Sequence, residues 1–192
     1  MQKLDHPNII SFKEVIESED SLCLVMEAFN NLSLADYLKM IGKTNSEKSG
    51  KKEKKKISEE SARVIMGQIF SAFGYLHSKN IIHRDVKLEN ILISIKDLKV
   101  KLIDFGFSVI EDELEDKLLK DYCGTPNYIA PEIVKKRGYE GKPADIWSLG
   151  ILLFGLVTGT YPFKSISEKS DFSKVQKLHE YELSDSLKEL LS

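Results

Sequence analysis

The chain is poor in the residues that define several classes of protein. Its 192 residues include only two cysteines, Cys23 and Cys123, which lie far apart and in no metal-ligand spacing. This scarcity argues against a disulfide framework and against a zinc site. The longest apolar run, residues 146–157, is shorter than the roughly 20 residues that span a hydrocarbon core. The first residues lack the apolar core and cleavage site of a signal peptide, so we expect an intracellular, cytoplasmic protein without a transmembrane segment.

The chain also has little excess charge of either sign. Its formal net charge is -2, which gives no reason to expect nucleic acid as a main partner. One segment departs from this balance, because residues 42–56 contain seven lysines and two glutamates. We interpret this lysine-rich insert as a solvated, disordered loop, with docking on an acidic partner or a membrane surface as the alternative. The apolar share of 42% is sufficient for the core of one or two domains.

The first part of the chain predicts a hairpin followed by a helix. Residues 11–16 and 22–26 are β-prone and are separated by a polar turn, which is typical of two antiparallel strands. Two strands alone are marginally stable in water, so this hairpin needs further partners. Ser33 is a candidate N-cap for a helix over residues 34–40.

The middle of the chain predicts a long helix, a second pair of strands and a buried helix. Ser58 is a candidate N-cap for a helix that ends near residues 78–80. Residues 91–95 and 99–103 predict short strands, and Asp145 begins the apolar helix. The apolar side chains of the long helix recur at helical spacing: Ala62, Ile65, Ile69, Ala72, Phe73 and Leu76.

The stretch at residues 82–93 holds charged and polar groups between two apolar runs. Lys87 follows Asp85 by two positions and Asn90 follows it by five, and the chain then becomes apolar at once. An ordinary surface loop has no need for these groups at these offsets. We therefore interpret the stretch as a chemical site.

This stretch resembles the catalytic loop of protein kinases, whose pattern is H-R-D-L-x-x-x-N. Asp104-Phe105-Gly106 resembles the family's metal-binding motif, and residues 124–132 resemble the end of its activation segment. Residues 145–150 stand where the family has its central buried helix. Because these motifs follow one another in the expected order, the chain is identified as a member of the eukaryotic-type serine/threonine protein kinase family.

The resemblance implies an α+β, protein-kinase-like fold with a mainly helical C-lobe. Residues 1–31 would be a remnant of the N-lobe β-sheet, with the hairpin and the hinge. Residues 32–192 would be the C-lobe, truncated at its C-terminus and carrying the insert at 42–56. No glycine-rich G-x-G loop is present, and neither is the lysine that contacts the ATP phosphates in the family. We therefore expect this chain alone to be inactive and to bind ATP poorly.

The resemblance also implies a reaction, in which the γ-phosphate of ATP passes to a serine or threonine hydroxyl of a protein substrate. Asp85 would be the catalytic base, and Lys87 would neutralise the transferring phosphate. Asn90 and Asp104 would hold Mg²⁺ through their oxygens. Thr125 would hydrogen-bond to Asp85 and Lys87. Thr125 and Lys87 are typical of serine/threonine kinases rather than tyrosine kinases.

The same resemblance places the adenine of ATP beside the predicted hairpin. Met26 would lie at the back of the pocket, and Glu27 and Phe29 would offer backbone hydrogen bonds to the base. Ser33 would contact the ribose, and Leu92 would form the apolar floor. For Met26 and Leu92, plain core packing explains the residue type equally well.

Several residues would support the site rather than react. His83 and Phe105 resemble members of an apolar stack between the lobes, and Gly106 completes the metal-binding turn. Asp145 resembles a buried anchor that accepts backbone N–H bonds from His83 and Arg84.

Two acidic residues raise separate expectations. Asp121 stands four positions before Thr125, where many relatives carry a phosphorylated threonine, and our hypothesis is that it pairs permanently with Arg84. The alternative is that Asp121 is one more acid in an acidic loop. Glu132 is expected to be buried without the arginine that would pair with it.

Two further functions stay open. A non-catalytic, pseudokinase-like scaffold would account for the missing lysine, whereas the retained Asp85, Lys87, Asn90 and Asp104 favour the enzyme. A binding protein that acts through the lysine-rich insert at 42–56 is the third possibility. The sequence does not indicate the oligomeric state.

Overall fold

The computed structural model describes residues 4–29, 32–49, 55–113, 118–135, 138–170 and 178–191. The strands are β1 (Phe12–Glu17), β2 (Leu22–Met26), β3 (Ile81–Ile82), β4 (Ile91–Ser94), β5 (Lys99–Leu102) and β6 (Val109–Ile110). The α-helices are α1 (Leu34–Ser49), α2 (Glu59–Ser78), α3 (Pro131–Val134), α4 (Gly141–Thr158) and α5 (Asp185–Leu191). Short 3-10 helices are η1 (Leu88–Asn90), η2 (Glu111–Glu113), η3 (Ile166–Ser170) and η5 (Leu178–Glu180).

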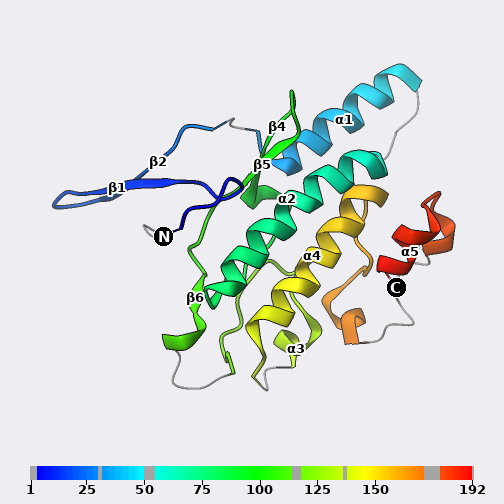
Figure 1. The fold of residues 1–192 in the computed structure, drawn as a ribbon. Coiled ribbons are helices and arrows are strands. Elements are labelled where there is room, and N and C mark those ends of the chain that lie inside the picture. The colour runs from blue at the N-terminus through cyan, green and yellow to red at the C-terminus, as the bar shows by residue number, and fades with distance from the viewer. Residues whose placement is uncertain are drawn as a thin grey trace.

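Helices α2 and α4 form the centre of the molecule and run side by side in opposite directions (Figure 1). The predicted apolar stripe of α2 is buried, and Ser58 caps this helix by accepting a hydrogen bond from the Ser61 amide. Helix α4 is apolar on nearly all sides, as expected of a core helix. It begins at Gly141 rather than at Asp145, because Pro143 is tolerated in a first turn. Within the described ranges, no helix is long and apolar enough to cross a membrane.

The strands form two-stranded antiparallel pairs rather than one continuous sheet: β1 with β2, β3 with β6, and β4 with β5. Both predicted hairpins are therefore present. In the β4–β5 pair, Ile93 lies opposite Val100 and both are buried, with β5 against α2 and β4 against α1. The amide of Ile10 donates to the Leu102 carbonyl at 2.9 Å, so the segment before β1 runs along β5. The stretch at 82–93 thus begins in β3 and ends in β4, with both ends fixed.

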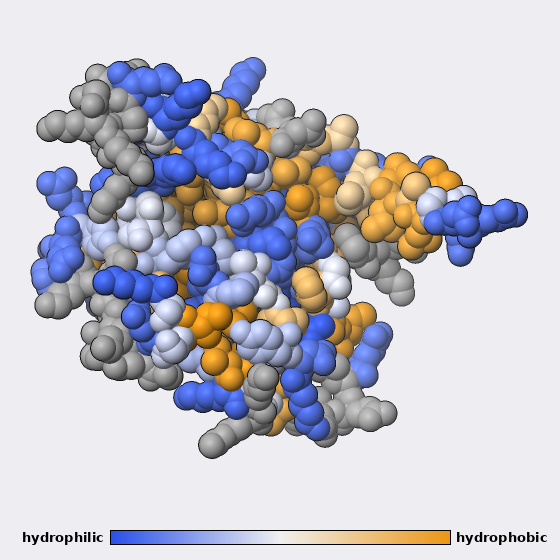
Figure 2. Space-filling model, turned by 180° about the vertical axis from the view of Figure 1, so that it is seen from behind, coloured by the Kyte–Doolittle hydropathy of each residue, from blue (hydrophilic) through white to orange (hydrophobic). Residues whose placement is uncertain are grey.

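The β1–β2 hairpin projects from the helices, and apolar side chains gather on it (Figures 1 and 2). Ile16 is 53% exposed, Leu22 63% and Leu24 50%. A two-stranded hairpin has little stability of its own. Among the described elements, this hairpin is therefore the one that depends most on a covering partner.

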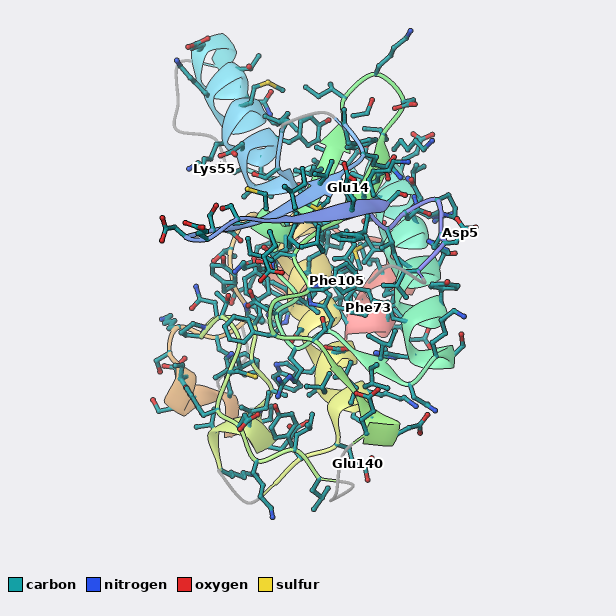
Figure 3. All side chains as sticks on the ribbon, turned by 90° about the vertical axis from the view of Figure 1, so that its left-hand side faces the viewer. Asp5, Glu14, Lys55, Phe73, Phe105 and Glu140 are labelled. Atoms are coloured by element: carbon teal, nitrogen blue, oxygen red, sulfur yellow. The ribbon has the colours of Figure 1, made fainter. Side chains whose placement is uncertain are left out.

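Helix α1 is longer than the sequence predicts. The helix was expected over residues 34–40 and the insert at 42–56 as a disordered loop, but α1 continues to Ser49. Residues 50–54 of the insert lie outside the described residues. Lys55 returns against α1, where a Cβ on Gly42 would lie 2.5 Å from its Cγ atom, and Figure 3 shows Lys55 beside this helix. Lysine is a good helix former, which explains why the lysine-rich sequence extends the helix.

Gly141→Ala is expected to destabilise the fold, because α4 starts in close contact with β3. A Cβ on Gly141 would lie 2.3 Å from Cδ1 of Ile82, which is itself 1% exposed. Overpacking of a core costs about 1–3 kcal/mol, and urea unfolding should show a loss of that size. The matched control is Gly150→Ala in the same helix, where the new Cβ meets nothing within 4 Å. The control should gain about 0.5–1 kcal/mol, and equal stabilities of the two variants would contradict the close packing.

Candidate active site

Asp85 lies at the centre of a set of hydrogen bonds between β3 and β4. Its side chain is 4% exposed, and Oδ2 accepts from Lys87 Nζ at 2.5 Å and from Asn90 Nδ2 at 3.1 Å. Oδ1 accepts from Thr125 Oγ1 at 2.7 Å. Burial alone would raise the pKa of Asp85, but the hydrogen bonds from Lys87 and Thr125 lower it below its usual value. The carboxylate is therefore ionised at neutral pH and can accept a proton.

Thr125 reaches Asp85 because the preceding residue allows a close approach of two loops. Gly124 has a φ of 97°, and a Cβ there would lie 2.7 Å from the Arg84 carbonyl oxygen. Only glycine fits both this conformation and this contact. The expected second hydrogen bond, between Lys87 and Thr125, is not found among the described residues, where Lys87 Nζ donates to Asp85.

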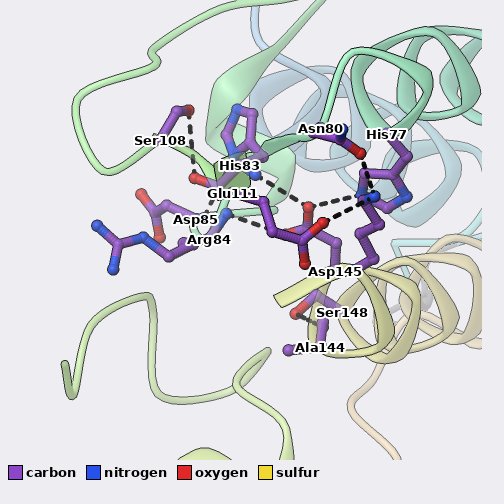
Figure 4. Close-up of polar contacts among 11 residues, drawn as sticks. His77, Asn80, His83, Arg84, Asp85, Ser108, Glu111, Ala144, Asp145 and Ser148 are labelled. Carbon is purple, nitrogen blue, oxygen red and sulfur yellow. Dashed lines mark hydrogen bonds and ion pairs between the residues drawn. The ribbon is translucent and has the colours of Figure 1, made fainter. Parts of the chain in front are cut away.

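Asp145 of α4 holds the backbone that leads into Asp85 (Figure 4). It is 2% exposed, and its Oδ2 and Oδ1 accept the amides of His83 and Arg84, both at 2.9 Å. These are the two bonds expected from the sequence. A third donor was not foreseen: His77 Nε2 of α2 lies 2.9 Å from Oδ2. Three donors compensate the burial of this carboxylate and join α2, α4 and the loop.

Arg84 connects the loop to the segment before Thr125. Its φ is 66°, a left-handed conformation that is uncommon for a residue with a side chain. Its Nε donates to the Phe107 carbonyl at 2.6 Å, and Nη1 lies 3.1 Å from Oδ2 of Asp121. The hypothesised Arg84–Asp121 pair is thus present, with the Asp121 side chain 75% exposed.

His83 is packed between two aromatic rings. Its ring centroid lies 5.2 Å from that of Phe105 and 5.7 Å from that of Phe73, and Figure 3 shows both phenylalanines close together at the centre of the molecule. The sequence predicted Phe73 only as part of the core stripe. Burial lowers the pKa of His83, so the imidazole is neutral and acts here as a packing residue.

Asp104 and Asn90 present the oxygens expected of a magnesium site. Asp104 follows β5 with a φ of 63°, is exposed, and accepts the Gly106 amide on Oδ1 at 3.0 Å. The neighbouring Phe105 is buried and anchors this turn. Asn90 donates from its amide nitrogen to Asp85, so its side-chain oxygen would be the atom that binds a metal ion. Carboxylate and amide oxygens are ligands that Mg²⁺ accepts, so these residues fit the ion.

A cavity of about 530 Å³ lies between the hairpin and the Asp104 turn. It is lined by Met26, Glu27, Phe29 and Leu92, with Asp104 at its rim and its size typical of a small-molecule site. Four of the residues expected around adenine are therefore brought together.

Ser33 is not among the residues that line this cavity. Its hydroxyl instead accepts the Asp36 amide at 3.1 Å and donates to Asp36 Oδ2 at 2.7 Å. The N-cap predicted at Ser33 is confirmed, and its hydroxyl is committed to α1.

Lys101 of β5 is a site residue that the sequence did not reveal. It is 8% exposed and its ammonium pairs with the Glu27 carboxylate, which also accepts the Ser11 amide at 2.7 Å. Burial would raise the pKa of Glu27, but these donors lower it. The pair connects the segment after β2 to β5. Because Lys101 and Glu27 lie far apart in the sequence, no local sequence pattern predicts that they pair.

Glu132 corrects an expectation. It lies in the short helix α3 and is partly exposed rather than buried. Solvent therefore reduces the cost that an unpaired buried charge would carry.

These features together form the arrangement that the kinase resemblance predicted: an ionised aspartate with lysine and asparagine donors, held by a buried aspartate of the central helix. The family model described as Protein kinase domain matches residues 1–192, and the chain belongs to this family.

Its relatives are eukaryotic serine/threonine kinases, as the motifs predicted. The chain is 39% identical over 170 residues to NUAK family SNF1-like kinase 1 of Homo sapiens, covering 88% of this chain and 23% of that protein. It is 40% identical over 176 residues to Probable serine/threonine-protein kinase HSL1 of Saccharomyces cerevisiae, covering 92% and 11%. It is 35% identical over 176 residues to CBL-interacting protein kinase 3 of Oryza sativa, covering 91% and 36%. The chain thus spans only a minor part of each of these proteins.

Proposed function

We propose that the chain carries the catalytic site of a protein serine/threonine kinase, which transfers the γ-phosphate of ATP to a protein hydroxyl. The family generally uses ATP and Mg²⁺. The observation that carries the proposal is the convergence of Lys87, Asn90 and Thr125 on the buried carboxylate of Asp85. Such a set has no evident purpose in a structural core, because apolar residues would fill the same space at lower cost.

Each residue has a role that its chemistry permits. Asp85 accepts a hydrogen bond from the substrate hydroxyl and takes its proton, and Lys87 stabilises the negative charge of the transferring phosphate. Asn90 and Asp104 would supply oxygen ligands to Mg²⁺, which would neutralise negative charge on the phosphates. Thr125 fixes the carboxylate so that one orientation is kept.

The cavity beside the hairpin is the proposed site for the adenine of ATP. Glu27 and Phe29 line it, and their backbone groups are the proposed hydrogen-bond partners of the base, while Leu92 supplies an apolar wall. Two other lining residues, Leu24 and Met26, are 50% and 43% exposed, so one side of the cavity is open to water. We therefore expect weak ATP binding by this chain alone. The division into a small lobe at 1–31 and a large lobe at 32–192 stays a prediction.

The test is phosphate transfer by the longest natural protein that contains residues 1–192, with labelled ATP, Mg²⁺ and mixed peptide substrates. The proposal expects label on serine and threonine and none on tyrosine. Label on tyrosine alone would contradict the substrate class. Binding of a protein partner without any phosphate transfer would support the alternative, a non-catalytic scaffold. The observation that favours this alternative is that one side of the cavity is open to water.

Asp121→Ala is expected to lower kcat/KM by up to about fivefold, because an exposed ion pair contributes about 0.2–1 kcal/mol. The pair matters for activity since Arg84 directly precedes Asp85 in the chain. The matched control is Glu113→Ala, which removes an exposed acid of the preceding acidic segment. Equal activities of both variants and the unaltered protein would show that Asp121 is only one more acid.

A further inference from the structure

Lys169 of η3 is a buried lysine whose hydrogen-bond partners, in the described part of the chain, are three backbone carbonyls. It is 2% exposed, and its Nζ donates to the carbonyl oxygens of Pro126 at 2.7 Å, Asn127 at 2.9 Å and Ile129 at 2.8 Å. Lysine is almost never fully buried without a partner of opposite charge. A buried ammonium is costly unless its donors are satisfied, and here three N–H groups meet three acceptors.

The three carbonyls belong to the turn that directly follows Thr125. In this turn the amides of Tyr128 and Ile129 donate to the Thr125 carbonyl at 2.9 and 3.2 Å. The Thr125 hydroxyl in turn donates to Asp85. The Lys169 ammonium therefore holds three carbonyls of this turn together. The turn itself fixes Thr125, whose hydroxyl orients the Asp85 carboxylate.

We propose that Lys169 is a positioning residue, whose ammonium clamps the turn at residues 125–129 and so holds the Thr125 hydroxyl on Asp85. Its importance for the reaction rests on the proposed kinase function, whereas its effect on the turn does not. Lys169 itself touches neither Asp85 nor Thr125 among the contacts of the described residues, so it acts through the backbone.

Among the described residues, no carboxylate takes part in this clamp. The titratable groups on the elements packed around Lys169 are Glu132 and Lys135 on or beside α3, Glu168 on η3 and Tyr128 in the turn. None of these forms an ion pair with Lys169 within the described residues, and Glu168 instead accepts the Lys164 amide at 2.9 Å.

At neutral pH the clamp is made by the charged side chain. Burial lowers the pKa of Lys169 to about 8, so at pH 7 the side chain is still an ammonium with three N–H donors for three carbonyls.

The experiment is amide hydrogen exchange followed by mass spectrometry on a peptide that covers residues 124–130. At pH 7, Lys169→Met is expected to exchange about tenfold faster in this peptide than the unaltered chain, because three charged hydrogen bonds are lost. The control is Lys164→Met, which removes an exposed lysine of the same segment and should leave the peptide unchanged.

Equal exchange in Lys169→Met and the unaltered chain would overturn the proposal. If Lys169→Met does not fold, Lys169→Gln replaces it, because its amide keeps two N–H donors without the charge, and exchange equal to that of the unaltered chain would overturn the proposal instead. In the longest natural protein that contains the chain, Lys169→Met should lower kcat, while the KM for ATP stays unchanged. Two results together separate the proposals. If Lys169→Met speeds exchange in this peptide but the unaltered protein transfers no phosphate, the kinase function is rejected and the role of Lys169 in the turn is supported.

Discussion

Asp145→Ala should unfold the chain more readily than any exposed substitution, with a loss of about 3–5 kcal/mol in the free energy of unfolding. The side chain is 2% exposed and accepts hydrogen bonds from the amides of His83 and Arg84 and from His77 Nε2. Removing the acceptor leaves these donors unsatisfied in the interior. Since domains are stable by only about 5–15 kcal/mol, such a loss is a large share of the total.

The same change should also release strain in the loop. Arg84 has a φ of 66°, which persists only while its surroundings impose it, and the bond from its amide to Asp145 is one of those constraints. Loss of this bond should let the backbone before Asp85 relax. The variant should therefore lose the geometry of the site even under conditions where it is still folded.

Urea unfolding with Asp145→Ala, Asp145→Asn and Asp20→Ala measures this effect. Asp145→Asn keeps the side-chain volume and one acceptor oxygen, so it creates no cavity. Its loss of unfolding free energy therefore measures the contribution of the charge and of the second acceptor. Asp20 is exposed in the turn of the β1–β2 hairpin, and its removal should change stability by less than about 0.5 kcal/mol. A loss in Asp145→Ala no larger than in Asp20→Ala would contradict the role of Asp145 as an anchor.

The parts of the structure that the sequence predicted are those with a local signal. The stripe from Ala62 to Leu76 repeats at helical spacing, and each of its predicted members is buried in α2. Ser33 and Ser58 directly precede helices and cap them. Asp145 was placed by its motif, since no periodicity in an apolar helix shows which polar residue is buried and bonded.

The parts that could not be predicted depend on contacts between distant segments. Lys169 lies in a polar run without periodicity, and its three acceptors are backbone atoms about 40 positions away, which no pattern of side chains records. Lys101 and Glu27 are similarly remote from each other. The extension of α1 to Ser49 was missed for another reason: a lysine-rich sequence suits both a solvated loop and an exposed helix.

Asp85→Asn should abolish most phosphate transfer, with a fall in kcat of about 10²–10⁴-fold, which is the usual contribution of a positioned acid or base. The asparagine amide cannot take the proton of a hydroxyl. In the unaltered protein Lys87 and Thr125 donate hydrogen bonds to the carboxylate, and in the variant an N–H group of the amide would face one of these donors. The KM for ATP should change little, because Asp85 is not among the residues that line the cavity beside the hairpin. The matched control is Asp97→Asn, an exposed aspartate in the β4–β5 turn.

The pH dependence gives an independent reading of the same carboxylate. The pKa of Asp85 is lowered, so its ionised form contributes to activity and stability at neutral pH, and this contribution is lost only as the pH falls through a value below the usual aspartate range. Between pH 6 and pH 8, titration of Asp85 should therefore leave kcat unchanged. Activity of Asp85→Asn within tenfold of the unaltered protein would remove Asp85 from the role of base. Absence of transfer in the unaltered protein, with folding and partner binding intact, would make the arrangement around Asp85 that of a non-catalytic kinase relative.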